Sequence, residues 1–277
     1  MQHRHRASSL AAVAGALAGL LAFDAAIAAP EGAPPQLASH RAVYALSLGT
    51  ARSGSSTLDA RGAMYIELGA SCDGWTVSQR VRLTLYAAQG GDVDTDSNFS
   101  SWEARDGQSY RFTVRNLRDG EVSEEFRGSA RLSGDGHGGD AIFTTPPDKR
   151  FDLPRGSLFP TEHLIKLIMA AQQGHNRFSR VIFDGANLDG PLEVNAIIGR
   201  SASAGTTAGL GGELTNRIAW PMRMAFFPLR SQKAEPEYEV SVRLSDNGVA
   251  HHFLLDYGDF TVNAALTKIE PIAEPKC

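Results

Sequence analysis

Residues 99–116 read FSSWEARDGQSYRFTVRN, and this stretch predicts a β-hairpin. Its centre is Asp106-Gly107, a dipeptide typical of two-residue hairpin turns because both of its residues adopt a positive φ readily. Residues 99–105 and 109–116 flank the turn and have the usual length of strands. The stretch therefore indicates two antiparallel strands joined directly to each other.

The same pattern recurs on both sides of this hairpin. Apolar and polar residues alternate with a period of two, as in strands that bury one face. Further strands are expected at residues 40–48, 60–68, 75–88, 121–132, 140–145, 177–183, 191–199, 216–228, 237–244, 249–257 and 260–269. Turn signals separate these strands and no Pro/Ser-rich linker interrupts them. The chain is therefore expected to form a single mainly β, antiparallel domain over residues 39–277.

One segment departs from the strand pattern and predicts a helix over about residues 160–174. Thr161 is a plausible N-cap and Gly174 suits the position after the last turn. The apolar residues inside it form a broad stripe, made of Leu164, Ile165, Leu167, Ile168, Met169 and Ala171. So broad a stripe is typical of a helix buried on more than one side. A helix packed on one sheet face is the simpler alternative, and we favour a helix largely surrounded by sheet.

The first 28 residues predict a cleaved signal peptide. Arg4 and Arg6 precede an apolar run, and Ala26-Ile27-Ala28 is a small-x-small cleavage site. A retained membrane anchor is the alternative, but the run is short and rich in alanine and glycine. Residues 29–38 are rich in Pro, Ala and Gly and are expected to be a flexible lead-in. We therefore expect an exported protein that is not an integral membrane protein after cleavage.

The net charge of the chain gives information about its possible partners. The full chain has a formal net charge of −4, and loss of Arg4, Arg6 and Asp24 with the leader changes it to −5. So mild a negative charge gives no reason to expect a nucleic acid as a partner.

The chain has two cysteines, Cys72 and Cys277. In an oxidising compartment an even number of cysteines predicts a disulfide. A free or intermolecular thiol is the alternative. A bond between these two residues would tie the last residue of the chain to an early turn.

The search for catalytic motifs finds none of the common ones. The sequence has no G-x-S-x-G, H-E-x-x-H, P-loop or dinucleotide-binding glycine pattern, and it calls for no cofactor. Asp92, Asp94, Asp96 and Glu103 have the carboxylate spacing of a calcium loop. Ser97 stands where that loop needs glycine, and the flanks are strand-like. We therefore predict no metal site and expect an acidic, solvated loop.

Scattered polar residues leave a second function open. His163, Asp184 and Asp256 are distant in sequence, and a catalytic set is recognised by geometry rather than by spacing. His163 is expected to be a capping or surface residue, and the two aspartates are expected at solvated turns. His251 and His252 are adjacent on a strand and should point to opposite faces. A hydrolase assembled from such distant residues remains the alternative hypothesis.

The segment 220–228 is unusually apolar. In an extended conformation Trp220, Met222, Met224 and Phe226 share one face. A strand facing the core explains this pattern. The functional alternative is the lining of a hydrophobic groove, because methionine and aromatic side chains make adaptable binding surfaces. Pro221 and Pro228 suggest an edge strand, beside which an acyl chain or a partner strand could dock.

Several motifs together resemble the EipB-type periplasmic envelope-integrity family. They span most of the chain from Ser39 to Cys277: His40-Arg41-Ala42-Val43-Tyr44, Ala60-Arg61-Gly62, Cys72-x-Gly74-Trp75, Thr95-Asp96-Ser97, Ser101-Trp102-Glu103, Asp106-Gly107, Tyr110-Arg111-Phe112, Leu158-Phe159-Pro160-Thr161-x-His163 and the terminal Cys277. The resemblance implies a spiral-like, open-barrel antiparallel sheet wound about one central helix. It also implies a disulfide between Cys72 and Cys277.

The resemblance further implies a role in the envelope of Gram-negative bacteria and no established catalytic activity. The first hypothesis is therefore a non-enzymatic protein of the periplasm that supports cell-envelope integrity. It would bind a hydrophobic ligand, such as a lipid or the acyl chain of a lipoprotein, or a periplasmic or envelope protein. Trp220, Met222, Met224 and Phe226 are the residues expected to form that binding surface.

Overall fold

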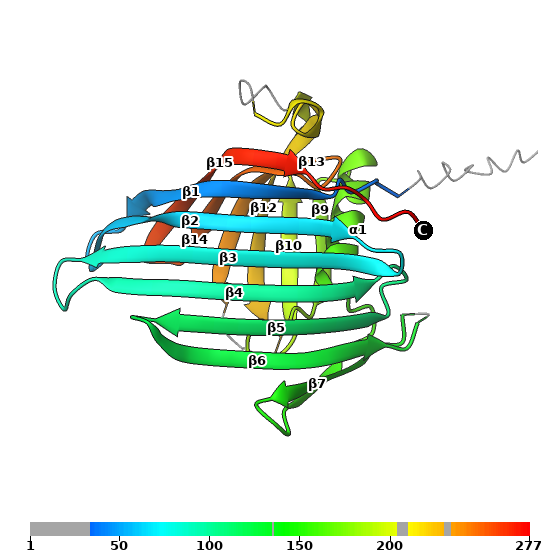
Figure 1. Ribbon diagram of the computed structural model, residues 1–277, viewed down its shortest axis with the longest axis horizontal. Coiled ribbons are helices and arrows are strands. Elements are labelled where there is room, and N and C mark those ends of the chain that lie inside the picture. The colour runs from blue at the N-terminus through cyan, green and yellow to red at the C-terminus, as the bar shows by residue number, and fades with distance from the viewer. Residues whose placement is uncertain (1–33, 135, 204–209, 230–233) are drawn as a thin grey trace, which may run out of the picture. The chain divides into compact units, whose positions relative to one another are not determined.

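In the described part of the chain, fifteen strands pair into one antiparallel sheet that curls around a helix (Figure 1). The computed structural model describes residues 34–134, 136–203, 210–229 and 234–277. The elements, in chain order, are β1 (His40–Ala51), β2 (Thr57–Ala70), β3 (Gly74–Ala87), β4 (Val93–Ala104), β5 (Ser109–Arg118), β6 (Glu121–Leu132), β7 (Gly139–Thr145), β8 (Arg150–Leu153), α1 (Pro160–Gln172), β9 (Arg177–Ile182), β10 (Leu192–Ile198), β11 (Ala202–Ser203), the 3₁₀ turn η1 (Gly212–Leu214), β12 (Ile218–Pro228), β13 (Tyr238–Ser245), β14 (Ala250–Asp256) and β15 (Phe260–Pro271).

The sheet consists of two meanders joined at its centre. The strand order is β8-β7-β6-β5-β4-β3-β2-β1-β15-β14-β13-β12-β10-β9, and β11 pairs with β12. The first and last strands therefore lie side by side, with Tyr44 opposite Leu266 on one side and Met64 on the other. The sheet is not a closed barrel, because β8 and β9 form its two ends. This confirms the mainly β, open-barrel architecture expected from the sequence.

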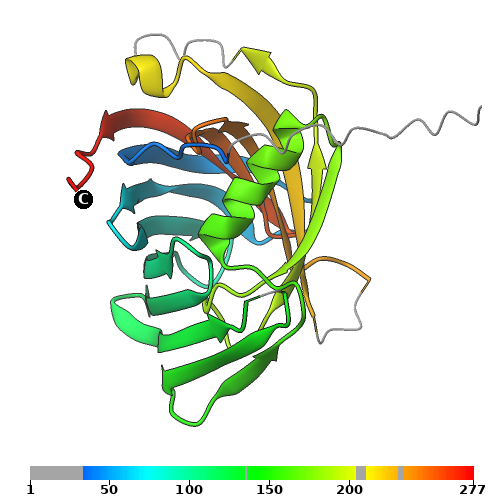
Figure 2. The same cartoon turned by 90° about the vertical axis from the view of Figure 1, so that its right-hand side faces the viewer.

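Helix α1 lies on the concave side of the curled sheet (Figure 2). Apolar and polar residues alternate along the strands because one face of the sheet packs inward. The inward residues of β10, β12 and β13 form a core cluster with the helix. Leu167 and Ile168 on the helix are 1% and 0% exposed, so the helix is buried deeply on its sheet side. A second, aromatic cluster fills the curve of β5 to β8 and includes Tyr110, Phe112 and Phe143.

The helix begins at residue 160, as predicted, and ends at Gln172, two residues before the predicted end, and a distant strand caps its start. Phe159 is the N-cap and makes no side-chain cap bond, so the prediction that Thr161 is the N-cap is wrong. The carboxylate of Glu103 on β4 caps the helix instead. Its Oε2 accepts from the amide of Thr161 and its Oε1 from the amide of Glu162, both at 2.7 Å. These two bonds satisfy amides that no helical carbonyl can reach, and they fasten α1 to the sheet.

The acidic segment before Glu103 is a strand rather than the loop expected from its composition. Asp94 and Asp96 lie on β4, where Asp96 pairs with Arg80 and Arg82. Glu103 lies on the opposite face of the same strand, because its position differs from theirs by an odd number. The calcium-loop spacing therefore brings no carboxylates together, and no group of three metal-ligating side chains occurs among the described residues.

A disulfide joins Cys72, in the turn between β2 and β3, to Cys277, with the two Cα atoms 5.6 Å apart. The tail that leads to Cys277 also contacts Ser39, the residue directly before β1. The amide of Ile272 donates to the carbonyl of Ser39, and the Ser39 hydroxyl donates to Glu274. The last strand and the tail are therefore fixed at several points.

The predicted signal peptide, residues 1–28, lies outside the described residues, as does the start of the predicted lead-in. The end of the lead-in differs from the expected flexible segment. Leu37 is 3% exposed and packs in the core cluster around α1, and the amide of Ala38 donates to the carbonyl of Asn247. The packed structure therefore includes residues before 39. No helix in the described part of the chain is long and apolar enough to cross a bilayer.

Candidate functional site

The four residues predicted to form a hydrophobic surface lie on the concave face of β12. Trp220 and Met222 are 7% and 3% exposed and pack in the core cluster around α1. Met224 and Phe226 are half-buried, and the Phe226 ring stacks on Tyr238 at 4.4 Å between centroids. The strand therefore has a buried half, which packs with α1, and a half-buried half that runs toward Pro228.

Strand β12 is not an edge strand, so the interpretation of Pro221 and Pro228 is wrong. It lies between β10 and β13, and Pro221 is opposite Arg243 in the register. The carbonyl of Pro221 accepts from the amide of Gly199, so the proline lacks only a donor. A partner strand therefore has no free edge at β12 on which to add.

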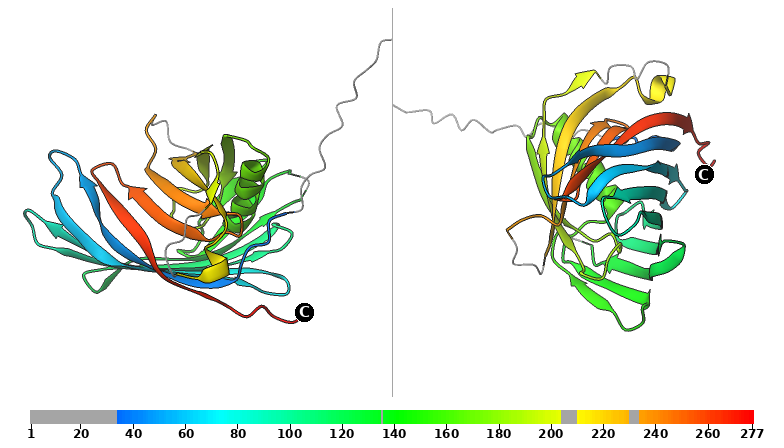
Figure 3. Two further views of the ribbon diagram at one scale, coloured as in Figure 1. Left: turned by 90° about the horizontal axis from the view of Figure 1, so that it is seen from above. Right: turned by 90° about the vertical axis from the view of Figure 1, so that its left-hand side faces the viewer.

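The half of β12 beyond the helix continues across the sheet. One cross-strand row runs from Met224 through Val240 and Leu255 to Val262 and Leu48. We call the half-buried apolar side chains of this region the open apolar face: Leu48, Ile66, Val81, Leu83, Leu85, Met224, Phe226, Val240, Phe253, Leu255 and Phe260. Seen from above, the strands of this part of the sheet extend away from the helix (Figure 3).

The sequence predicted only part of this open apolar face. The period of two predicts which residues of each strand point inward, but not which of them the helix covers. Soluble proteins rarely leave many contiguous apolar side chains accessible unless something binds there. The inward face beyond α1 is therefore the candidate surface for an apolar ligand.

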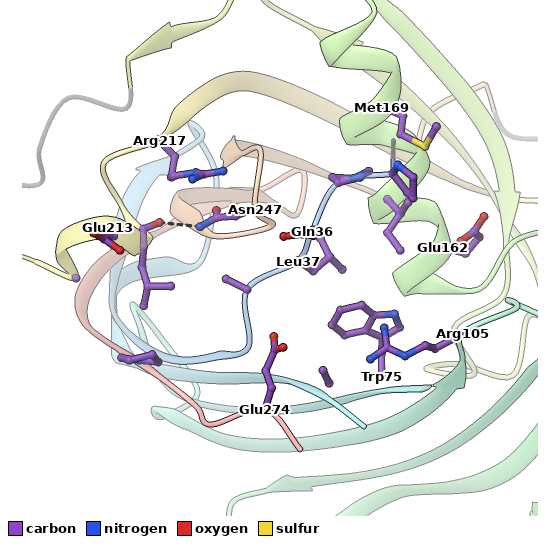
Figure 4. A pocket seen from close by; sticks show the side chains of 18 residues that line it. Gln36, Leu37, Trp75, Arg105, Glu162, Met169, Glu213, Arg217, Asn247 and Glu274 are labelled. Carbon is purple, nitrogen blue, oxygen red and sulfur yellow. Dashed lines mark hydrogen bonds between the residues drawn. The ribbon is translucent and has the colours of Figure 1, made fainter. Parts of the chain in front are cut away.

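A separate cavity of about 1290 Å³ opens beside residues 34–38 and the C-terminal tail (Figure 4). Leu37, Trp75, Ile165 and Met169 give it apolar walls, and Glu162, Glu213, Glu274, Arg105 and Arg217 add charges. Most of these charges are engaged within the protein. Arg217 pairs with Asp246, Glu162 pairs with Lys166, and the Arg105 guanidinium lies 4.7 Å from the Trp75 ring. None of the four predicted binding residues lines this cavity.

The candidate catalytic residues do not come together. His163 is buried in α1 and its Nε2 has no hydrogen-bond partner, so it is neither a cap nor a surface residue. Burial lowers its pKa to about 4, which keeps it neutral. Asp184 is partly buried and binds the amide of Ala186, and burial raises its pKa. Asp256 binds the amide of Gly258 at the end of β14. No hydrogen bond joins any two of the three among the described residues.

One serine and one histidine do contact each other. The Oγ of Ser245 lies 2.7 Å from Nε2 of His251. Ser245 is 0% exposed, and Nδ1 of His251 has no partner, so no carboxylate orients the ring. A nucleophile needs access and an oriented base, and this pair has neither. His252 points to the other face and is exposed, as predicted for adjacent residues on a strand.

The fold and the site define an open, barrel-like β protein with one helix inside its curve and an accessible apolar face beyond that helix. The chain belongs to the EipB-like family, whose model matches residues 31–273. The family resemblance drawn from the sequence is therefore confirmed.

Two comparisons agree with this assignment. The chain is 29% identical over 240 residues to the cell envelope integrity protein EipB of Brucella abortus (strain 2308), covering 85% of this chain and 84% of that protein. It is also similar to the crystal structure of a β-barrel-like protein of a domain of unknown function from Brucella abortus. That match has a TM-score of 0.79 and 27% sequence identity, and it covers 86% of this chain and all of the other.

Proposed function

We propose that this protein supports cell-envelope integrity from the periplasm by binding an acyl chain on the open apolar face. The role follows the name of the relative that shares 29% identity, and the periplasmic location follows the predicted leader together with the disulfide. The observation that carries the binding proposal is the row of apolar side chains from Met224 to Leu48, in which Met224, Val240, Leu255 and Leu48 are half-buried and Val262 is buried.

The positions of the candidate catalytic residues fit a non-enzymatic role. The predicted catalytic candidates lie apart, and the one serine–histidine contact is buried. An acyl chain suits the open apolar face because a chain of methylenes gains about 0.8 kcal/mol for each group removed from water. Methionine and phenylalanine side chains also adjust their shape to chains of different length.

The test is a titration with a fluorescent fatty acid, dansyl-undecanoic acid, against the purified mature protein. Saturable binding is expected for the wild type, and Met224→Asp should weaken it by tenfold or more, because a carboxylate on that face must be desolvated by the ligand. The matched control is Ile197→Asp. Ile197 lies on the convex face of the neighbouring strand and is 63% exposed, so this variant should change the affinity less than twofold.

Lack of saturable binding by the folded wild type, or equal loss in both variants, contradicts the proposal. Native mass spectrometry of the protein purified from its own periplasm distinguishes the alternative occupant. A co-purifying protein in place of a lipid would assign the same face to a protein partner.

A further inference from the structure

The convex face of β5 and β6 carries a regular alternation of arginine and hydroxyl side chains. The directly opposed outward pairs are Ser109 with Arg131, Arg111 with Ser129, and Thr113 with Arg127. The pairs between them face inward and are apolar: Tyr110 with Ala130, and Val114 with Phe126. In Figure 1 these strands lie in the lower part of the front layer of the sheet, whose convex face is turned toward the viewer. We call the outward arginines and hydroxyls the arginine ladder.

Two hollows adjoin on this face. One of about 490 Å³ is lined by Ser100, Ser101, Trp102, Arg111, Phe112, Thr113, Arg127, Gly128, Ser129 and Thr144. The other, of about 530 Å³, is lined by Tyr65, Ser78, Gln79, Arg80, Asn98, Phe99, Ser100, Thr113 and Arg115. They share Ser100 and Thr113, so they form one continuous depression. None of these lining residues is acidic.

Three of the four arginines in this depression have no acidic partner. Arg80 pairs with Asp96, whereas Arg111, Arg115 and Arg127 form no ion pair with any residue that the structure describes. The Arg111 guanidinium lies 4.3 Å from the centre of the Trp102 ring, which holds it in place without neutralising it.

Several acidic groups lie at the borders of the depression. Asp96 accepts from the lining residues Arg80 and Asn98, and Glu67 accepts from the hydroxyl of the lining residue Tyr65. Glu125 stands opposite Arg115 in the register but does not pair with it. Asp73 lies beside Trp102, and its pKa is lowered first by the Ser71 hydroxyl and in a smaller part by the charge of Arg111. None of these carboxylates lines either hollow, so the depression itself remains positively charged.

We propose that the arginine ladder and its two hollows bind an acidic glycan, a chain of sugars that carry carboxylate groups. Guanidinium groups match carboxylates in a two-pronged geometry, and the ladder offers several of them in succession. Diagonal neighbours across two strands lie about 7–8 Å apart, so successive arginines suit a polymer of charges better than one small anion. The hydroxyls of Ser100, Thr113 and Ser129 can donate to and accept from sugar hydroxyls.

A membrane surface fits this face less well. Peripheral membrane binding combines basic residues with apolar side chains that enter the lipid. The side chains that point outward in the two hollows are arginines, serines and threonines, and the side-chain amide of Asn98. Trp102 and Tyr65 are the aromatic exceptions. A face of this composition favours a hydrated, hydroxyl-rich ligand.

The experiment is a calorimetric titration of the mature protein with a galacturonate hexamer at low ionic strength. Binding is expected for the wild type and should weaken as salt is added. The triple variant Arg111→Gln, Arg115→Gln and Arg127→Gln should lose affinity by tenfold or more. The control triple variant Arg155→Gln, Arg177→Gln and Arg200→Gln changes the net charge equally at exposed sites elsewhere, and it should stay within twofold of the wild type.

Several outcomes would overturn the proposal. Equal loss in the control variant would mean that only net charge matters. Binding of poly-aspartate or of phosphatidylcholine vesicles containing phosphatidylglycerol as tightly as of the hexamer would assign the ladder to an acidic protein or to a membrane. A neutral maltohexaose should not bind. Both triple variants should keep the wild-type melting temperature and the fatty-acid binding proposed above, so this test is independent of the open apolar face.

Discussion

Replacing Cys72 and Cys277 by serine should lower the free energy of unfolding by about 5 kcal/mol. The two residues are separated by 205 positions, and the chain-entropy model gives this value for opening so long a loop. Both side chains are exposed, so serine adds no loss of packing at either position. The measurement is urea denaturation of the mature double variant beside the wild type, followed by circular dichroism.

Two controls isolate the cross-link. Wild-type protein reduced with dithiothreitol should unfold at the same urea concentration as the double variant. Limited proteolysis should release a C-terminal fragment from the variant first, because the tail then depends on the contacts of Ile272 and Glu274 with Ser39. A double variant that unfolds together with the oxidised wild type would show that the bond contributes nothing to stability.

Replacing Glu103 by alanine should lower the free energy of unfolding by roughly 3 kcal/mol. Glu103 is 2% exposed, and its carboxylate accepts from the first two amides of α1. Its loss leaves the amides of Thr161 and Glu162 without acceptors and opens a cavity between helix and sheet. Urea denaturation at pH 6 measures the effect. The matched control is Glu121→Ala on the exposed start of β6. This variant should lower the free energy of unfolding by less than about 0.5 kcal/mol, the usual limit for a surface substitution.

The same carboxylate should make stability depend on pH. Burial raises the pKa of Glu103 from its ordinary value of 4.5 to about 7, although the two amides act in the opposite direction. The folded protein therefore keeps a proton that the unfolded chain releases between these values. This contribution to stability is complete below pH 4.5 and is lost as the pH rises through 7.

A comparison with Glu103→Gln measures that contribution. Between pH 4.5 and 8 the wild type should lose up to about 3 kcal/mol relative to this variant, which cannot ionise. Taking the difference between the two proteins removes the effect of other groups, such as buried His163. Parallel stability curves over this range would contradict the assignment of a raised pKa to Glu103.

Most of the secondary structure was predictable because its signals are local. The Asp106-Gly107 turn and the alternation on each side predicted β4, β5 and the hairpin between them. The broad apolar stripe predicted α1 and its burial. The start of β4 was missed, because Asp94 and Asp96 look like loop residues until Arg80 and Arg82 of the neighbouring strand are placed beside them.

The candidate site was predictable only in part. The period of two correctly put Trp220, Met222, Met224 and Phe226 on one face, but it could not divide them into a covered and an accessible half. That division depends on where α1 ends over β12, and α1 lies elsewhere in the sequence. The same limit explains the wrong edge assignment. Pro221 indicates only that its backbone nitrogen cannot donate a hydrogen bond, and it does not indicate which strands lie on either side of β12.

Local sequence patterns were enough to predict many antiparallel strands, one buried helix and the residues of each strand that turn inward. Backbone periodicity and turn chemistry act over a few neighbouring residues, so they can be read without the fold. Three features became visible only in the folded chain: Glu103 caps α1, β1 pairs with β15, and arginines of β5 and β6 alternate with hydroxyls across one surface. Each of these depends on the register between segments, and register is set by the packing of the whole sheet.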